Sequence, residues 1–324
     1  MRILVVGIGS IGTRHTANLL SLGYSNISLV SGKDVLDKSF SRLKKYNSLE
    51  SALIHGQYDA AIICTPTSFH AKDAIKILDS NIYNIYIEKP VNSTWDGVAE
   101  LVQLSKAKNA RIVIGYDLHF DPGVLKVKEL ISTGLYGKPL SANAIVGQYL
   151  PDWRPKENFM QGSSARKDTG GGVLLDLIHE FDYLYWLFGH VSTVAAFHTS
   201  GEILGIETEE IADVLLKFQE GITATVHLDY MQPSLIRQCM ITCTKGSICI
   251  DMAKREVRSI DDKKNESFFS YKDLERNDRF KLIIKTFLED QNDSRLTNLE
   301  QGLESLKIVL AAKKSCQENK FIRP

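Results

Sequence analysis

Residues 2–12 read R-I-L-V-V-G-I-G-S-I-G and decide the fold of this chain. The run Arg2–Val6, which is apolar from Ile3 onward, predicts a short buried strand, and the segment after the glycines carries apolar residues at roughly helical spacing up to Gly23. Glycines placed between a strand and a helix are typical of a dinucleotide-binding turn, because they allow a tight turn, close approach of a pyrophosphate and close helix packing. The helix then points its N–H groups at the phosphates. The expected cofactor contacts are Gly7, Gly9, Ser10, Ile11 and Gly12.

The residues after the second predicted strand, Asn26–Val30, are expected to select the form of the cofactor. An acid that binds the ribose usually stands there, about 20 residues beyond the glycines. This chain has Ser31, Gly32, Lys33 and Asp34 instead. Ser31 and Lys33 would tolerate or attract a 2′-phosphate, whereas Asp34 could still bind an unphosphorylated ribose. The cofactor is therefore predicted to be NAD or NADP, with NADP favoured.

Strand-like and helix-like segments alternate through this part of the chain. Strands are expected at Asp59–Cys64, Ile85–Ile87 and Arg111–Gly115, with helices through Ala71–Leu78 and Val98–Leu104 between them. Alternation at this spacing predicts a doubly wound parallel sheet, in which ligands bind at the carboxyl ends of the strands.

Two polar motifs follow strands of this predicted sheet. Thr65-Pro66-Thr67-Ser68-Phe69-His70 comes after one strand, and Glu88-Lys89-Pro90 comes after the next. Proline has no N–H to donate, so Pro90 ends its strand and fixes how Lys89 is presented. The tripeptide alone would also fit an ordinary strand end with one solvated lysine. Its company among the other motifs favours a ligand-binding role.

The segment Tyr149–Gly172 is long and polar. A loop above roughly 15 residues in a compact domain is usually functional or disordered. Trp153, Arg154 and Arg166 supply an aromatic ring and two guanidinium groups, which suit recognition of a phosphate or carboxylate. A solvated surface loop is the alternative.

Residues 170–182 read G-G-G-V-L-L-D-L-I-H-E-F-D and predict the start of a helix. Asp176, His179 and Asp182 would then lie along one face of it. A carboxylate there can hold a hydroxyl group while the imidazole accepts its proton. A histidine with a structural role is the alternative, which the glycine run and Lys89 make less favoured.

The remainder of the chain is dominated by alternating apolar and polar runs. They indicate a mostly antiparallel sheet, with Thr223, Thr225 and His227 on one face. A helix is expected before it at Gly123–Ser132, and two helices are expected after it. The strand-like runs are Ala212–Phe218, Ile222–Leu228, Cys239–Cys243, Ser247–Ile250 and Glu256–Ile260, and the closing helices are Asn277–Leu288 and Leu299–Ser315.

Composition narrows the range of functions. Lys plus Arg and Asp plus Glu both number 39, so no excess of positive charge suggests nucleic acid or an anionic membrane as partner. No apolar run approaches the length of a membrane span. The five cysteines lack C-x-x-C spacing, so neither disulfides nor a metal site are expected, which suits a reducing cytoplasm.

Taken together, Gly7–Gly12, T-P-T-S-F-H, E-K-P and G-G-G-V-L-L-D-L-I-H resemble the Gfo/Idh/MocA family of NAD(P)-dependent oxidoreductases, from the first strand to the last helix. The resemblance implies an α/β fold with a Rossmann domain at residues 1–121. A second α/β domain, at residues 122–324, would carry a large, open, mostly antiparallel sheet, and the last helix could pack back on the first domain. The family resemblance also implies that the protein acts on sugars or polyols and that its subunits contact one another through the open face of this sheet.

The resemblance also implies roles for individual residues. Glu88 and Lys89 would reach the nicotinamide, and Lys89 would polarise the reacting oxygen. His179 would be the general acid and base, and Asp176 would orient the substrate, although it stands three residues before the histidine where the family commonly has four. The residues expected to flank the nicotinamide ribose are Thr65, Pro66, Thr67 and His70.

Two departures from the family pattern bear on the substrate. Asp117 and His119 stand where the family commonly has an amide and an arginine, so they either bind substrate or belong to a linker that never touches it. The family resemblance also implies a kinked E-K-P turn, in which the Lys89–Pro90 bond is expected to be cis.

The predicted function is hydride transfer between nicotinamide and a hydroxyl or ketone of a sugar or nucleotide sugar, by a homodimer or homotetramer. The segments Q-Y-L-P-D-W-R-P and S-A-R-K also resemble a subgroup tied to cell-surface sugar biosynthesis. A regulator that senses cofactor without turnover is the main alternative, and an oxidoreductase for a non-sugar substrate is another.

Overall fold

The computed structural model describes residues 1–32, 37–155 and 157–324, which form two compact units. The first unit comprises Met1–Asp117 and Arg276–Leu303, and the second comprises Leu118–Glu275 and Glu304–Pro324. A single helix near the end, α9 (Leu299–Glu318), begins in the first unit and continues in the second. The division of the chain into domains at residue 121 stays a prediction, and residues 276–303 group with the first unit.

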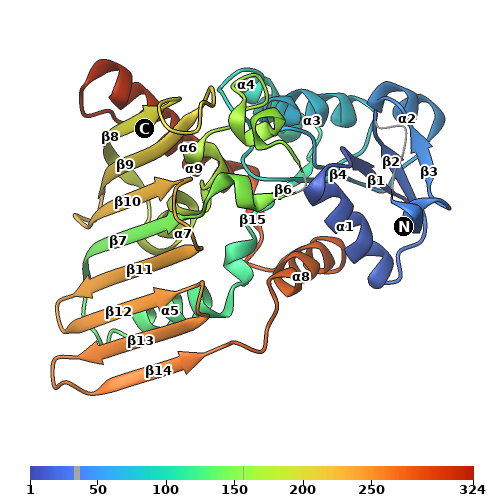
Figure 1. The fold of residues 1–324 in the computed structure, drawn as a ribbon. Helices are drawn as coiled ribbons and strands as arrows, with labels where there is room; N and C mark the ends of the chain where they lie inside the picture. Colours follow the sequence, from blue (N-terminus) through green and yellow to red (C-terminus); the bar gives the residue numbers. More distant parts are fainter. Residues whose placement is uncertain (33–36, 156) are drawn as a thin grey trace. The chain divides into compact units, whose positions relative to one another are not determined.

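The described part of the first unit contains a sheet of seven strands in the order β15-β6-β5-β4-β1-β2-β3 (Figure 1). The strands pair in parallel, except that β15 runs antiparallel to β6. The central strands are completely buried, as expected for a parallel sheet covered on both faces. The strands are β1 (Ile3–Val6), β2 (Ile27–Val30), β3 (Lys44–Tyr46), β4 (Ala60–Ile63), β5 (Asn84–Ile87), β6 (Arg111–Ile114) and β15 (Thr297–Asn298).

Helices cover both faces of this sheet. α1 and α8 pack together on one face, while α3 and α4 pack together on the other (Figure 1). α1 turns its buried residues, among them His15 and Leu19, toward the sheet. The helices are α1 (Ser10–Ser21), α2 (Leu49–His55), α3 (His70–Asp79), α4 (Val98–Ala107) and α8 (Arg276–Glu289).

The second unit is built on a sheet whose described strands number eight, in the order β14-β13-β12-β11-β7-β10-β9-β8. Neighbouring strands are antiparallel, apart from the parallel pair β7 and β10. The predicted fold class, a Rossmann sheet with a second α/β part, is therefore confirmed. The strands are β7 (Pro139–Gly147), β8 (Val191–Ser200), β9 (Glu209–Phe218), β10 (Thr223–Asp229), β11 (Ile236–Cys243), β12 (Gly246–Asp251), β13 (Glu256–Asp261) and β14 (Glu266–Ser270).

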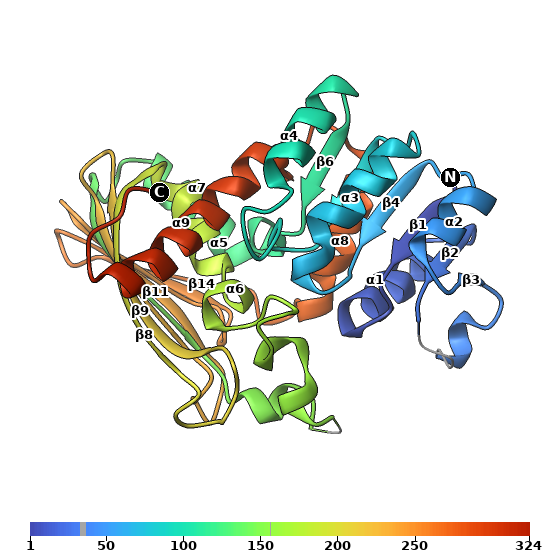
Figure 2. The same ribbon diagram turned by 90° about the horizontal axis from the view of Figure 1, so that it is seen from above.

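The helices of the second unit lie on one face of its sheet, as Figure 2 shows for α5 (Pro122–Ser132), α7 (His179–Phe188) and the later turns of α9. The strands alternate accordingly. In β10, Ala224 and Val226 are buried under the helices, while Thr223 and Thr225 are exposed on the other face, here called the outer face.

The predicted single helix after the glycine run is wrong. The structure has two helices, α6 (Val173–Asp176) and α7 (His179–Phe188), with a tighter turn between them. The N–H of Glu180 bonds to the carbonyl of Leu177, three residues back, so the α-helical hydrogen-bond pattern is interrupted there. Asp176 therefore ends one helix and His179 begins the next.

Short 3-10 helices complete the described structure. Three of them lie in the long polar segment that begins at Tyr149, which is therefore partly ordered by its own turns. They are Lys38–Phe40, Thr67–Phe69, Asp117–Phe120, Leu150–Trp153, Phe159–Gln161 and Ser163–Ala165.

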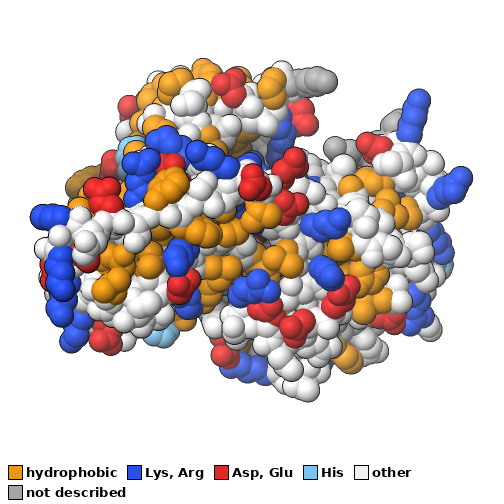
Figure 3. Space-filling view, turned by 90° about the horizontal axis from the view of Figure 1, so that it is seen from below, with side chains coloured by type: hydrophobic (Ala, Val, Ile, Leu, Met, Phe, Trp, Pro, Cys, Tyr) orange, Lys and Arg blue, Asp and Glu red, His pale blue; other side chains and the backbone are white. Residues whose placement is uncertain are grey.

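Side chains of both charges are interspersed over the face shown in Figure 3, in keeping with the equal numbers of basic and acidic residues. Within the described residues, no helix combines the length and the apolar character needed to cross a membrane.

Candidate functional site

The glycine turn after β1 leaves room for a ligand at one glycine and packs tightly at the other two. A Cβ atom at Gly7, whose φ is +90°, would lie 2.7 Å from the carbonyl carbon of Cys64, and one at Gly12 would lie 1.9 Å from the Gly7 oxygen. At Gly9 no described atom lies within 4 Å of the Cβ position. Gly9 also precedes α1 without a side chain to cap it, so the N–H groups of Ser10 and Ile11 can serve an anion. This cradle fits a dinucleotide pyrophosphate.

Ser31 follows β2 directly, at the position predicted to select the cofactor. It is buried, and its N–H donates to the Tyr46 carbonyl of β3 at 3.0 Å. The predicted contact of Lys33, and the alternative through Asp34, lie outside the described residues. The described residue that directly follows β2 therefore carries an uncharged hydroxyl rather than a carboxylate.

The loop after β4 is held from within the first unit by His70. The Nδ1 atom of His70 lies 2.7 Å from the Pro90 carbonyl oxygen, and Nε2 lies 2.8 Å from that of Thr65. Burial lowers the pKa of His70, although its contacts with the two carbonyls raise it. The Thr65 hydroxyl donates to Asp73 at 2.8 Å. His70 thus joins the loop Thr65–Thr67, which includes Pro66, to the E-K-P motif.

The E-K-P motif places one acid inside the unit and one base at its surface. Glu88 is buried and lies 2.6 Å from Nε2 of His15 on α1, and Tyr86 donates a hydrogen bond to it at 3.3 Å. Burial, and then the negative charge of Glu88, raise the pKa of the Cys64 thiol. Lys89 is partly exposed, and the Lys89–Pro90 bond is cis, as predicted.

Asp117 is the last residue of the first unit's opening segment. It is buried, and Nε of Arg279 on α8 donates to its Oδ2 at 2.9 Å. The negative charge at this position is therefore balanced by an arginine within the same unit. Substrate binding by Asp117 stays a prediction.

His119, in the second unit, is enclosed by its neighbours. Its Nε2 lies 3.0 Å from Asp182, and its ring stacks on Trp186 at 4.0 Å between centroids. The ammonium of Lys128 lies 3.5 Å from the centre of the same tryptophan. With 4% of its surface exposed, His119 fits a structural role better than direct contact with substrate. The contact with His119 also accounts for the burial of Asp182, which the sequence pattern placed on one helix face with Asp176.

The predicted anion-binding residues differ in their surroundings. The indole N–H of Trp153 donates to the Gln148 carbonyl at 3.2 Å, and its ring meets the edge of Tyr230. Arg154 pairs with Glu157 at 3.8 Å, and Nε of Arg166 donates to Asp168 at 2.9 Å. Both arginines are exposed, so their guanidinium groups are accessible to a ligand. Their binding role stays a prediction.

Asp176 and His179 lie at the junction of α6 and α7. Asp176 is partly exposed, and its Oδ2 accepts a hydrogen bond of 2.7 Å from the Tyr230 hydroxyl. His179, the first residue of α7, is buried to 9% exposure. The junction thus presents an oriented carboxylate and an imidazole three residues apart, a pair that can bind a hydroxyl and move its proton.

The glycine run before α6 is explained by contacts inside the second unit. A Cβ atom at Gly171 would lie 2.3 Å from the Ser163 carbonyl oxygen, and one at Gly172, whose φ is +107°, would lie 1.9 Å from a carboxylate oxygen of Glu209. The glycines therefore let α6 approach β9 and the preceding turn closely.

Two contacts of this site were missed in the sequence. His15 stands among the buried residues of α1, where a histidine in an apolar stripe could have signalled a buried partner. Tyr230 directly follows β10, as Glu88 follows β5, but an aromatic residue after a strand is too common to stand out. Both act on predicted residues, Glu88 and Asp176.

Comparison with known proteins defines the class. Residues 1–116 match the oxidoreductase family with an NAD-binding Rossmann fold, and residues 124–249 match the GFO/IDH/MocA C-terminal domain. The chain therefore belongs to the Gfo/Idh/MocA family of oxidoreductases.

Individual relatives span the whole chain. A myo-inositol 2-dehydrogenase of Thermotoga maritima is 25% identical, over 100% of this chain and 98% of its own. Among solved structures, the WlbA dehydrogenase of Bordetella pertussis in complex with NADH and UDP-GlcNAcA has a TM-score of 0.84 at 18% identity, covering 100% and 97% of the two chains. An aldose-aldose oxidoreductase of Caulobacter crescentus has the same TM-score and identity, covering 100% and 99%.

Proposed function

We propose that this protein is an NAD(P)-dependent oxidoreductase that moves a hydride between nicotinamide and a hydroxyl or ketone of a sugar or nucleotide sugar. The observation that carries the proposal is the junction of α6 and α7, where Asp176 is oriented by Tyr230 and is followed by buried His179. A sensor without turnover has no need of a histidine that transfers a proton. The family and the glycine cradle support the cofactor.

The proposed roles divide the chemistry between the cofactor and the side chains. Bound nicotinamide would supply or accept the hydride. His179 would take the proton from a substrate hydroxyl or return it to a ketone. The ammonium of Lys89 would stabilise negative charge on the reacting oxygen, and Asp176 would bind a neighbouring hydroxyl.

The substrate class draws support from one relative and from the long polar segment. The Thermotoga maritima relative is named for a cyclic polyol, which offers the same secondary hydroxyls as a sugar ring. Among the described residues, Arg154 and Arg166 pair with exposed carboxylates, and such surface pairs contribute about 0–1 kcal/mol. Either guanidinium can therefore exchange its partner for the phosphates of a nucleotide sugar. A role in cell-surface sugar biosynthesis would follow from such a substrate.

For the cofactor, we propose that NADP binds at least as well as NAD, because Ser31 presents no carboxylate to repel a 2′-phosphate. Titration of both cofactors at one ionic strength tests this, with Ser31→Asp as the matched variant. The variant should weaken NADP selectively. A clear preference of the unaltered protein for NAD would contradict the proposal.

We also propose a homodimer or homotetramer formed through the outer face of the second sheet. This face exposes large apolar side chains on β8, β9, β11 and β14, and monomeric proteins rarely expose a broad apolar patch. Sedimentation at micromolar concentration should show a species larger than 36.3 kDa, and a 36.3 kDa species would contradict it. A cytoplasmic location is supported by the five free cysteines. The apolar side chains are Phe197, Leu215, Met240 and Phe268.

The function is tested by incubating the protein with reduced or oxidised cofactor and a panel of cyclic polyols, aldoses and uridine-diphosphate sugars. Nicotinamide absorbance should change with at least one member of the panel. Tight cofactor binding without any change would favour the cofactor-sensing regulator instead.

A further inference from the structure

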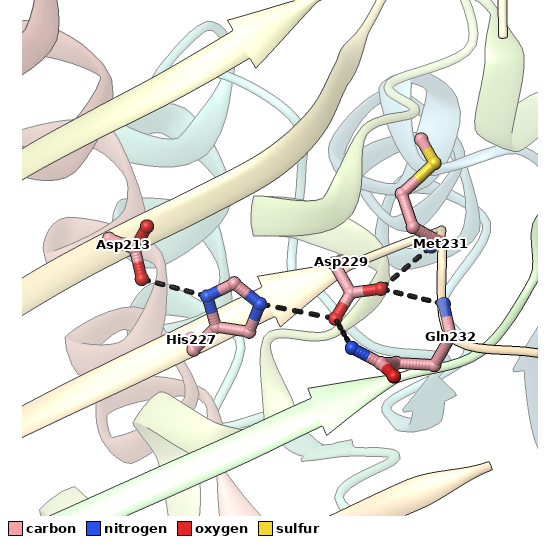
Figure 4. Close-up of polar contacts among 5 residues, drawn as sticks. All are labelled: Asp213, His227, Asp229, Met231 and Gln232. Atoms are coloured by element: carbon pink, nitrogen blue, oxygen red, sulfur yellow. Dashed lines mark hydrogen bonds and ion pairs between the residues drawn. The ribbon is translucent and has the colours of Figure 1, made fainter. Parts of the chain in front are cut away.

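A histidine on the outer face of the second sheet is held between two carboxylates. His227 of β10 stands directly opposite Asp213 of β9 in the strand register. Its Nδ1 lies 2.7 Å from Asp213, and its Nε2 lies 3.1 Å from Asp229, as Figure 4 shows. Carboxylate oxygens accept hydrogen bonds, so both contacts form only when the ring carries a proton on each nitrogen. The geometry therefore calls for an imidazolium.

The charges around this ring favour the same state. The hydrogen bond to Asp229 and that to Asp213, against partial burial, raise the pKa of His227 to about 9. On the other neighbouring strand, β7, the register partner of His227 is Ile145, which carries no charge. The diagonal positions in the described strands are also uncharged: they are Ile211, Leu215, Asn143 and Gly147. Asp213 and Asp229 are thus the charged groups that face the ring.

Asp229 also organises the turn that follows β10. Its Oδ1 accepts the N–H groups of Met231 at 2.7 Å and Gln232 at 2.9 Å (Figure 4). Burial alone would raise the pKa of Asp229, but its hydrogen bonds, that of His227 foremost, lower it below its ordinary value. The turn is packed tightly, because a Cβ atom at Gly147 would lie 2.3 Å from the Asp229 carboxylate. Asp229 is therefore a fixed carboxylate that His227 restrains from the opposite side.

The same turn carries contacts of the candidate site. Its first residue, Tyr230, donates its hydroxyl to Asp176 at 2.7 Å. The Tyr230 carbonyl accepts the N–H of Leu150 at 3.0 Å, and the Gln232 carbonyl accepts that of Tyr149 at 2.7 Å. One turn thus fixes both the orientation of Asp176 and the beginning of the long polar segment.

We propose that His227 is a positioning residue, which fixes the Asp229 turn from the outer face and thereby holds Tyr230 against Asp176. The part of this inference that concerns catalysis rests on the proposed function. The part that concerns the turn is independent of it. His227 itself touches neither the hydroxyl of Tyr230 nor Asp176, so its effect passes through the backbone of residues 229–232.

Hydrogen exchange tests the turn without any need for a substrate. In His227→Gln, the amides of Tyr149, Leu150, Met231 and Gln232 should exchange about tenfold faster than in the unaltered protein at the same pH. Thr225→Val, on the same strand and face, should leave these rates unchanged. Unchanged exchange in His227→Gln would overturn the proposal. Equal acceleration by Thr225→Val would also overturn it, because the effect would then belong to the face in general.

A second variant and a kinetic cycle separate positioning from general destabilisation. Asp213→Asn keeps the side-chain shape but removes one charge facing His227, so it should reproduce the faster exchange if His227→Gln fails to fold. With an active substrate, His227→Gln should lower kcat about tenfold and leave cofactor binding unchanged. Combining it with Tyr230→Phe should add little further loss. Fully additive losses would overturn the catalytic part, and absence of turnover with every substrate would refute the proposed function while leaving the exchange result valid.

Discussion

The two units hold their candidate functional residues by different means. In the first unit the candidate residues are positioned mainly by the backbone, through a glycine turn and two strand ends. His70 joins the two strand ends by contacting the backbone carbonyls of Thr65 and Pro90. In the second unit a side chain that is distant in the sequence sets the geometry, since Tyr230, in the turn after β10, lies 54 positions from Asp176. Positioning by the backbone can be recognised in the sequence as glycine and proline motifs. Positioning by a side chain that is distant in the sequence can be recognised only in the folded sheet.

The largest expected effect is on the acid and base of the second unit. His179→Ala should lower kcat by about 10²–10⁴-fold, because general acid–base catalysis contributes that much. Cofactor affinity should stay the same, since the cradle lies in the first unit. Steady-state kinetics and cofactor titration measure both. His190→Gln, at an exposed histidine of the same unit, is the control, and normal turnover by His179→Ala would remove the residue from the mechanism.

The next effect concerns stability of the first unit. His15→Ala would remove the hydrogen-bond partner that lies 2.6 Å from the buried Glu88 carboxyl group, and leaving a buried polar group short of a partner costs about 1–3 kcal/mol. Chemical denaturation gives the free energy of unfolding. The exposed His55→Ala on α2 should cost little, and His15→Leu with Glu88→Leu should cost less than His15→Ala alone. If His15→Ala is as stable as the unaltered protein, the contact between His15 and Glu88 does not stabilise the E-K-P motif.

A smaller effect is expected where a side chain, rather than the backbone, orients the site. Tyr230→Phe removes the hydrogen bond to Asp176 and should lower kcat about tenfold, since a hydrogen bond to a charged group contributes roughly 1.5 kcal/mol or more. Tyr136→Phe, which removes a buried hydroxyl bonded to Ser259, is the matched control. Equal kinetics for the two variants would mean that Asp176 needs no such support.

The smallest effect is a dependence of stability on pH. Because the pKa of His227 rises from 6.5 to about 9 on folding, its contribution is fully present below about pH 6.5 and is lost as the pH rises through about 9. The difference in unfolding free energy between the unaltered protein and His227→Gln should therefore shrink between about pH 6 and pH 10. His198→Gln, at an exposed histidine beside Ser200, should show no such trend. A constant difference for His227→Gln would contradict the imidazolium.

The sequence was informative where function depends on the backbone. The glycine turn, the parallel sheet and the cis Lys89–Pro90 bond followed from spacing and from the family resemblance, because each leaves glycine, proline or periodic apolar residues behind. The mostly antiparallel second sheet followed from strict alternation, as in β10.

The sequence was less informative where tertiary packing overrides the helical periodicity of the apolar residues. Residues 173–188 have an uninterrupted helical pattern, yet the structure breaks the helix between Asp176 and His179. The site also depends on pairs such as His15 with Glu88 and Tyr230 with Asp176, which only the folded sheets bring together. For His119 the sequence left a substrate contact and a linker role open, because nothing in it reveals the stacking of the ring on Trp186.

Single-turnover transfer of deuterium from labelled reduced cofactor to an oxidised sugar or polyol tests the central claim most directly. Mass spectrometry of the product should show deuterium with the unaltered protein. With Lys89→Ala the transfer should be about 10²-fold slower while the cofactor still binds, because the charge that stabilises the reacting oxygen is lost. No transfer to any member of the sugar panel, or equal transfer by Lys89→Ala, would contradict the account.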